Sequence, residues 1–150
     1  MAAIDYEGIR NGLKAIIEAA SGTSNARVYI EEEPQFGLMD QPAVAIFLMN
    51  RNARDAQQSL SKGTRIRFDL RCELWVMAFH LESYERACVE RDRLMANLEL
   101  ALMSDHTIGG KANTSNLQGG EMVSGRNGGD GVFMAASQII LMIDVTATTT

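Results

Sequence analysis

Residues 65–80, with the sequence RIRFDLRCELWVMAFH, decide the fold. Every second residue is apolar over the whole stretch, and this period of two is typical of a β-strand. Sixteen residues at about 3.3 Å each would span about 53 Å, which is longer than an ordinary strand. The apolar face comprises Ile66, Phe68, Leu70, Cys72, Leu74, Val76 and Ala78.

The opposite face of this strand changes character along its length. It begins with charged residues, from Arg65 to Glu73, and ends with Trp75, Met77 and Phe79. The first half therefore predicts one solvated face, and the second half predicts cover on both faces. Since two helices cannot cover so much apolar strand, subunit contacts are expected to supply the rest.

Two amphipathic helices are predicted. Apolar residues recur at spacings of three and four over residues 3–20 and again over 83–103. Ser83 is a suitable N-cap for the second helix, with Glu85 in its first turn. That helix ends at 104–110, SDHTIGG, which predicts a helix stop followed by a tight turn.

The other strands are weaker in pattern. We expect strands over 27–33, 43–50 and 132–146, and a short one over 121–124, with irregular chain over 111–120 and a frayed tail over 147–150. The segments 43–50 and 75–80 can pair antiparallel in the core, so 51–72 becomes an arm that projects from the body. The predicted fold is one α+β domain over 1–150: a mostly antiparallel mixed sheet flanked by two helices, with a projecting hairpin or loop arm.

Composition narrows the functional classes. The chain has 150 residues, 46% of them hydrophobic, and a formal net charge of −5. It is therefore not a generally basic nucleic-acid binder. Cys72 and Cys88 are expected to be reduced thiols. The first ten residues do not resemble a targeting peptide, and 132–145 is too short and polar to cross a bilayer, so a cytosolic chain with no membrane partner is expected.

Motifs for catalysis, cofactors and metals are missing. Gly109-Gly110-Lys111-Ala112 lacks the earlier glycine and the hydroxyl residue of a phosphate loop. Ser104, Asp105 and His106 are adjacent, whereas a catalytic triad converges from separate segments. The acidic run Glu31-Glu32-Glu33 lacks the additional ligands of a cation site. We therefore expect no catalytic residue, no cofactor and no metal.

The clearest functional signal is charge. Residues 51–71 carry six basic side chains and only two acidic ones, in a chain of net charge −5. A basic arm on an acidic body favours docking between charged surfaces. A solvated loop with incidental charge is the plainer interpretation. The basic residues are Arg51, Arg54, Lys62, Arg65, Arg67 and Arg71.

Several segments together resemble a known family. These are the N-terminal amphipathic helix, the alternating strand RIRFDLRCELWVMAF and the helix ESYERACVERDRLMANLELALMSD. They are followed by the closing segment DHTIGGKANTSNLQGGEM and the terminal strand VFMAASQIILMIDVTAT. In this order, over about residues 1–147, the chain resembles the tail terminator family of long-tailed bacteriophages, also called tail completion or minor tail proteins.

The resemblance implies a structural virion protein of the tail and neck region, assembled in the host cytoplasm. Such proteins form a hexameric ring that caps the tail tube, ends its polymerisation and docks the tail to the head connector. The implied partners are further copies of the chain, the tail tube protein, the head–tail connector or stopper protein and, in a contractile tail, the tail sheath. Genomic DNA passes through the lumen without sequence-specific binding.

On this basis the arm residues would pair with carboxylates of a partner, and Glu31, Glu32 and Glu33 would supply such carboxylates on the adjacent subunit. Another neck ring, such as a head-completion or stopper protein, is an alternative of the same class. A monomeric adaptor or binding module is an alternative of a different class, as are an enzyme and a nucleic-acid binder that uses the arm.

Overall fold

The computed structural model describes residues 3–33, 42–54, 65–127 and 132–148. Over these residues the chain forms two helices and an open, mixed sheet of six strands, so the predicted α+β class is confirmed. The first helix, α1, spans Tyr6–Ala19. Its N-cap is Asp5, whose side chain accepts a hydrogen bond from the Gly8 amide. The second helix, α2, spans Tyr84–Ser104 and is capped by Ser83 as predicted.

Strands β1 (Arg27–Ile30), β2 (Ala43–Ala53) and β3 (Arg65–His80) form one half of the sheet. Strands β4 (Thr114–Gly119), β5 (Met122–Asn127) and β6 (Phe133–Thr148) complete it. The order is β1-β2-β3-β6-β4, and β5 pairs with β6 beyond β4. The β1–β2 pair is parallel and all other pairs are antiparallel.

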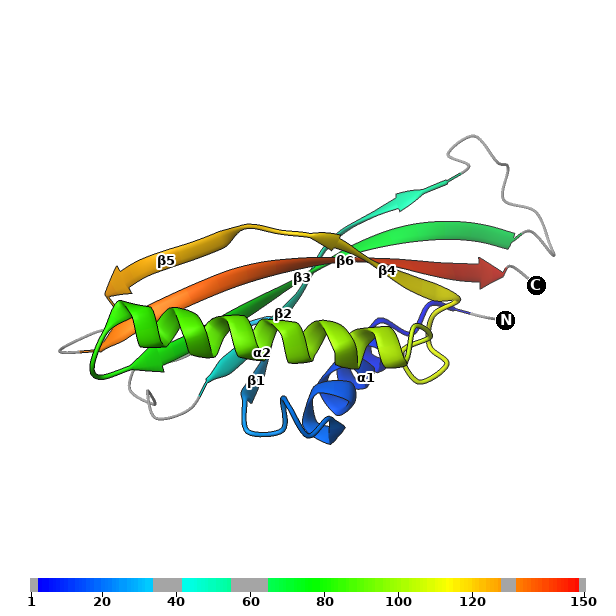
Figure 1. Cartoon of the computed structure of the whole chain (residues 1–150). Coiled ribbons are helices and arrows are strands. Elements are labelled where there is room, and N and C mark those ends of the chain that lie inside the picture. The colour runs from blue at the N-terminus through cyan, green and yellow to red at the C-terminus, as the bar shows by residue number, and fades with distance from the viewer. Residues whose placement is uncertain (1–2, 34–41, 55–64, 128–131, 149–150) are drawn as a thin grey trace.

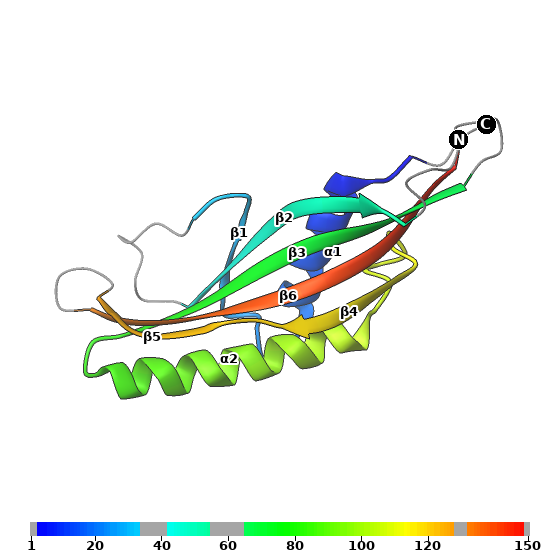
Figure 2. The same cartoon turned by 90° about the horizontal axis from the view of Figure 1, so that it is seen from above.

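Both helices lie on the same side of the sheet (Figures 1 and 2). Their buried residues share one core with alternate residues of the central strands, and α1 contacts α2. Leu13 and Leu98 of the helices lie fully buried together with Leu74 of β3 and Leu141 of β6. The side of the sheet turned away from both helices is called the open face below.

The predicted arm is present, but it has three strands. The β3 segment from Arg65 to Arg71 pairs with Met142–Thr148 of β6, and its part from Phe68 to Arg71 pairs on the other edge with Asn50–Ala53 of β2. These strand ends run past the helices, at the right of Figure 1. Residues 55–64, which include Lys62, lie outside the described residues. The strand predicted over 43–50 is longer in the structure, since residues 51–53 extend β2.

A bulge shifts the register of β2. Leu48 pairs with Cys72 and Asn50 pairs with Arg71, so Met49 is an extra residue and is 53% exposed. Beyond the bulge, Asn50 and Asn52 share the open face with Arg71 and Asp69, and Arg51 turns toward the helices. A single inserted residue reverses the faces of everything that follows it, and the sequence pattern does not reveal it.

Residues 111–120, predicted to be irregular, contain strand β4. Strands β4 and β5 follow each other along β6 and meet at Gly119 and Gly120. At Gly120 an added Cβ would lie 1.8 Å from the carbonyl oxygen of Gln138, so only glycine fits. The final strand is also longer than predicted, because Ala147 and Thr148, expected to be frayed, pair with β3.

Candidate assembly surface

Three arginines of the arm are paired with carboxylates within the chain. Arg54 donates to both oxygens of Asp69, at 2.8 to 3.1 Å, and its guanidinium is 3.8 Å from Asp144. Arg67 donates to the carboxylate of Asp144 on the neighbouring strand. Arg71 donates to Glu73 at 3.2 Å. The basic arm is therefore a ladder of ion pairs across β2, β3 and β6.

Asp144 lies at the centre of this ladder and is only 4% exposed. Burial by itself raises the pKa of its carboxyl. The Arg67 hydrogen bond and the charges of Arg54 and Arg67 lower this pKa by more than burial raises it, so the net pKa is below the ordinary value. The carboxylate is therefore ionised at neutral pH. It fixes two guanidinium groups on the open face of the arm.

Arg51 takes a different position, on the helix side of the sheet. Its guanidinium lies 5.9 Å from the centre of the Tyr6 ring and 5.4 Å from that of Phe68, and it donates to the Tyr6 hydroxyl at 2.8 Å. These cation–π contacts join the base of the arm to the first turn of α1. Arg65, at the start of β3, is exposed and has no ion-pair partner among the described residues.

The three glutamates do not act as a single acidic patch. Glu31, with φ of 57°, accepts from Arg10 at 3.0 Å and from the backbone amide of Leu48 at 2.8 Å. Its carboxylate therefore continues the pairing of β1 along the edge of β2. Glu32 and Glu33 are exposed. Within the chain, none of these carboxylates pairs with an arm arginine over the described residues, so their role toward a partner remains a prediction.

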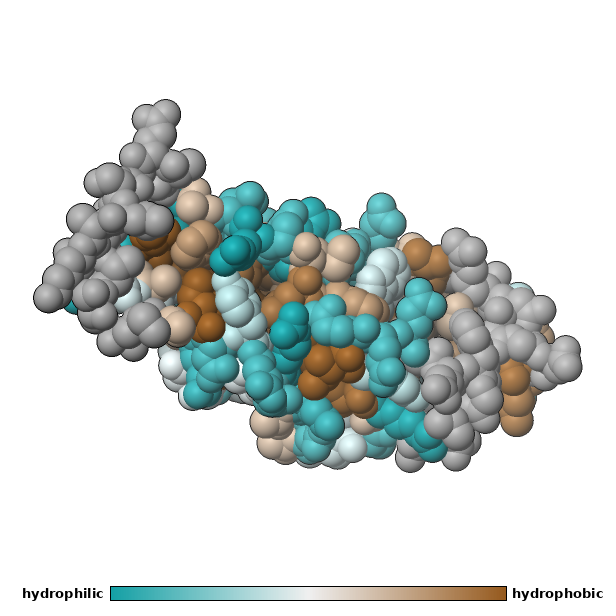
Figure 3. Space-filling model, turned by 180° about the vertical axis from the view of Figure 1, so that it is seen from behind, coloured by the Kyte–Doolittle hydropathy of each residue, from teal (hydrophilic) through white to brown (hydrophobic). Residues whose placement is uncertain are grey.

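The open face carries an apolar surface that the sequence pattern predicted. No helix or strand of the described residues packs on it, and its larger apolar side chains are half-buried between neighbouring strands. In the view from behind, apolar side chains reach the surface among polar ones (Figure 3). The larger apolar members are Phe47, Trp75, Met77, Phe79, Ile140 and Met142.

A second exposed apolar surface lies on α2, and sequence reasoning missed it. Val89, Leu100 and Met103 are 49%, 65% and 66% exposed, and Ala96 is exposed between them. At 100° per residue all four fall on one side of the helix, opposite the buried Leu94 and Leu98. The helical periodicity could have revealed this row, which is called the outer stripe below.

The buried side of α2 is fixed by Arg91, which is 4% exposed. Its guanidinium donates to the carbonyl oxygens of Val123 at 3.1 Å and Ala136 at 3.2 Å, and to Asp92. This side chain anchors the helix to β5 and β6. It therefore fixes which residues of α2 face outward.

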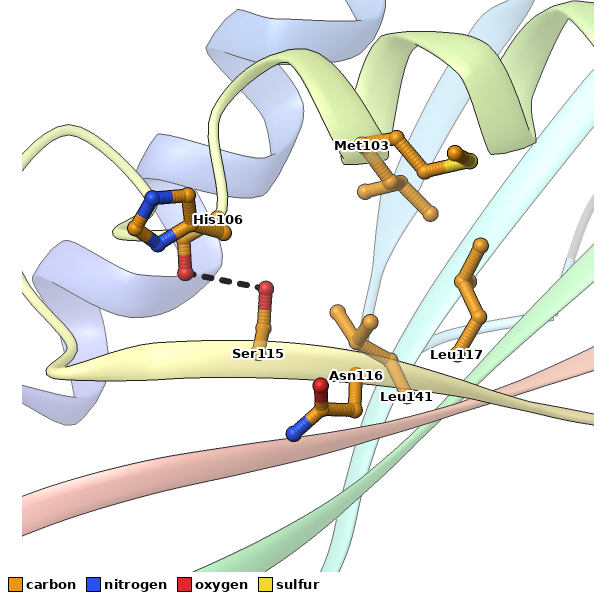
Figure 4. A pocket seen from close by; sticks show the side chains of 7 residues that line it. Met103, His106, Ser115, Asn116, Leu117 and Leu141 are labelled. Atoms are coloured by element: carbon orange, nitrogen blue, oxygen red, sulfur yellow. Dashed lines mark hydrogen bonds between the residues drawn. The ribbon is translucent and has the colours of Figure 1, made fainter.

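A histidine lines one pocket in the described part of the chain. A shallow pocket of about 350 Å³ lies between the end of α2 and β4 (Figure 4). His106 is its one titratable lining residue, and the Ser115 hydroxyl donates to the His106 backbone carbonyl at 3.0 Å. Burial raises the pKa of the Cys72 thiol to about 12, so Cys72 is not a thiolate at neutral pH.

Within the described ranges, no group of three metal-binding side chains could hold an ion. His80 accepts a hydrogen bond from the Glu82 amide at 3.0 Å. Over the same ranges no helix is long and apolar enough to cross a membrane.

Comparisons with known proteins return little. No family model matches the chain, and no curated protein matches it significantly. Among solved structures, it is similar to a chain of an extracellular contractile injection system, the PVC sheath/tube terminator in its extended state. The identity is 11% and the TM-score 0.46, over 99% of this chain and 59% of the other, so this chain spans about three fifths of that chain's length. A likeness this low carries no conclusion about function.

Proposed function

We propose that this chain is a structural, non-catalytic subunit of a ring that terminates a tail tube. The observation that carries the proposal is the one-sided sheet. Both helices cover one face, while the other is apolar over the body and charged over the arm. A sheet with such a face is stabilised by a further protein layer, and a subunit of a closed assembly obtains that layer from its neighbours.

The finer features of the proposal come from the family resemblance in the sequence. In this proposal the ring has six copies of the chain. It binds the tube protein and sheath on one side and the head connector or stopper on the other. The location is the neck of a virion. The order of elements supports them: α1, β1 to β3, α2 and β4 to β6 follow the order of the segments that carry the resemblance.

The ordered arm gives the ring a projecting element. Because Asp69 and Asp144 hold their arginines on one face, the arm can meet a partner without first losing much conformational freedom. The exposed end at Arg65 is then available to carboxylates of a partner. The body itself carries much of the chain's negative charge, which would repel DNA passing nearby.

The test is capping. Tail tube protein encoded beside this chain would be polymerised with and without it, and tube lengths and ends would be measured by electron microscopy. Shorter tubes with extra density at one end are expected. Unchanged lengths with no bound chain would contradict the terminator role. In that case, a stable ring would favour another neck protein, and a monomer would favour an adaptor.

A further inference from the structure

Two exposed apolar surfaces of the chain have matching lengths. The outer stripe of α2, from Val89 to Met103, extends about 21 Å at 1.5 Å per residue. The apolar part of the open face extends about 20 Å along β3, from Phe79 to the level of Glu73, where Phe47 of β2 and Ile140 of β6 flank that carboxylate. A helix that lies lengthwise on this face would therefore cover it from end to end.

The chain already packs a helix on its sheet in this way. On the covered face, α2 runs back along β3 and β6, and its buried side contacts both strands. The outer stripe is on the opposite side of the same helix, so α2 can contact its own sheet and another one simultaneously. It would then lie as a layer between two sheets.

Charge defines how the two surfaces would be oriented. The exposed side of α2 is mixed in charge near its start. Glu85 and Glu90 have no ion-pair partner among the described residues, Arg86 pairs with Glu82, and Arg93 is exposed nearby. From Ala96 to Met103 the outer stripe is apolar. The open face is apolar at Phe79. Toward the arm its arginines are paired within the chain except Arg65, which is the exposed cation at the far end. Apolar contact at one end therefore brings Glu85 and Glu90 toward the arginines at the other end.

We propose that the outer stripe of α2 in one copy packs on the open face of a second copy, with α2 parallel to the β3 that it covers. The occupant of the open face is thus a second copy of this chain. Because the two surfaces differ, each copy contacts two neighbours, and such a heterologous contact closes into a ring when the rotation allows it. This inference rests on the proposed function and names the contact between its subunits.

The experiment uses two complementary variants of the full chain. Leu100→Lys places a charge in the outer stripe, and Met77→Glu places the opposite charge on the open face. Each alone should raise the protein concentration needed for half-assembly at least about tenfold, the usual effect of a charge in an interface centre. Leu81→Lys is the matched control, since Leu81 is 74% exposed outside both surfaces; it should change that concentration less than about twofold.

Mixing distinguishes this contact from others. In an equimolar mixture, the lysine that the helix variant carries on its outer stripe meets the glutamate that the sheet variant carries on its open face. The remaining contacts have the native residues. The mixture should regain the assembled mass, measured by light scattering, in an alternating ring with an even number of copies. Met134→Glu, next to Phe79 at the same end of the open face, replaces the sheet variant if thermal unfolding shows that Met77→Glu does not fold.

The inference is overturned if Leu100→Lys assembles as readily as Leu81→Lys, or if the mixture stays unassembled while both variants are folded. In either case a wild-type ring that caps tubes leaves the proposed function intact. If the wild-type chain caps tubes only as a monomer, the open face contacts the tube, and the proposed contact between copies is overturned. A wild-type chain that neither assembles nor caps tubes overturns both.

Discussion

Replacing Asp144 by asparagine removes the negative charge that Arg67 and Arg54 share. A hydrogen bond to a buried charged group contributes about 1.5 to 3 kcal/mol. Asparagine still accepts one hydrogen bond, and Arg67, which is 51% exposed, can be rehydrated. We therefore expect the lower end, a loss of about 1.5 kcal/mol in the free energy of unfolding. In urea, with a slope of about 2 kcal/mol per molar, the midpoint falls by about 0.8 M.

The pH dependence of this difference tests its cause. Asp144 has a native pKa below its ordinary value, so its contribution is complete above the unfolded pKa of about 3.9 and is lost as the pH falls through the native pKa. The difference in stability between wild type and Asp144→Asn should be full at pH 7 and should shrink as the pH falls below about 3.9 and through the native pKa.

Asp69→Asn provides the matched control. Asp69 accepts from Arg54 in the same ladder but is 31% exposed, so its loss should cost about 0.5 kcal/mol at pH 7. Urea unfolding followed by circular dichroism gives all three midpoints. A wild-type midpoint for Asp144→Asn, or a difference that persists unchanged to pH 2, would refute the reasoning that one buried carboxylate orders the arm.

Three further substitutions, two of them with a comparison variant, have defined outcomes. Arg91→Ala leaves two carbonyl oxygens without their donor and should lower the free energy of unfolding by about 3 kcal/mol, whereas the exposed Arg93→Ala should change it by less than about 0.5. Gly120→Ala should cost more than about 2 kcal/mol because its Cβ meets a carbonyl, and Gly109→Ala, with open space but φ of 65°, about 1. Arg65→Glu should weaken assembly at low salt and less so at high salt; equal assembly at every salt would exclude a role for this charge.

The elements with strong periodicity were predictable. Alternation over 65–80 and helical spacing over 83–103 became β3 and α2 almost residue for residue, because burial of one face dictates each pattern. Strand β4 was missed for the opposite reason. Its sequence, TSNLQG, has a single apolar residue, and its conformation is imposed by pairing with β6.

The state of the arm charges was not predictable from their number. Arg67 and Asp144 are 77 residues apart in sequence, and only the register between β3 and β6 brings them together. Because of the bulge at Met49, Arg51 lies on the helix side of the sheet and not on the open face that strict alternation from Leu48 would give it. A basic segment read along the chain therefore became a ladder of paired charges, whereas the apolar open face, which rests on alternation alone, was anticipated.

The central claim is that copies of this chain cover each other's open sheet face in a ring. Light scattering of the purified chain at two concentrations and two salt levels tests it most directly. The account predicts a mass near six times 16.4 kDa, or a monomer that converts to that mass as its concentration rises. A mass of one chain under every condition would contradict it.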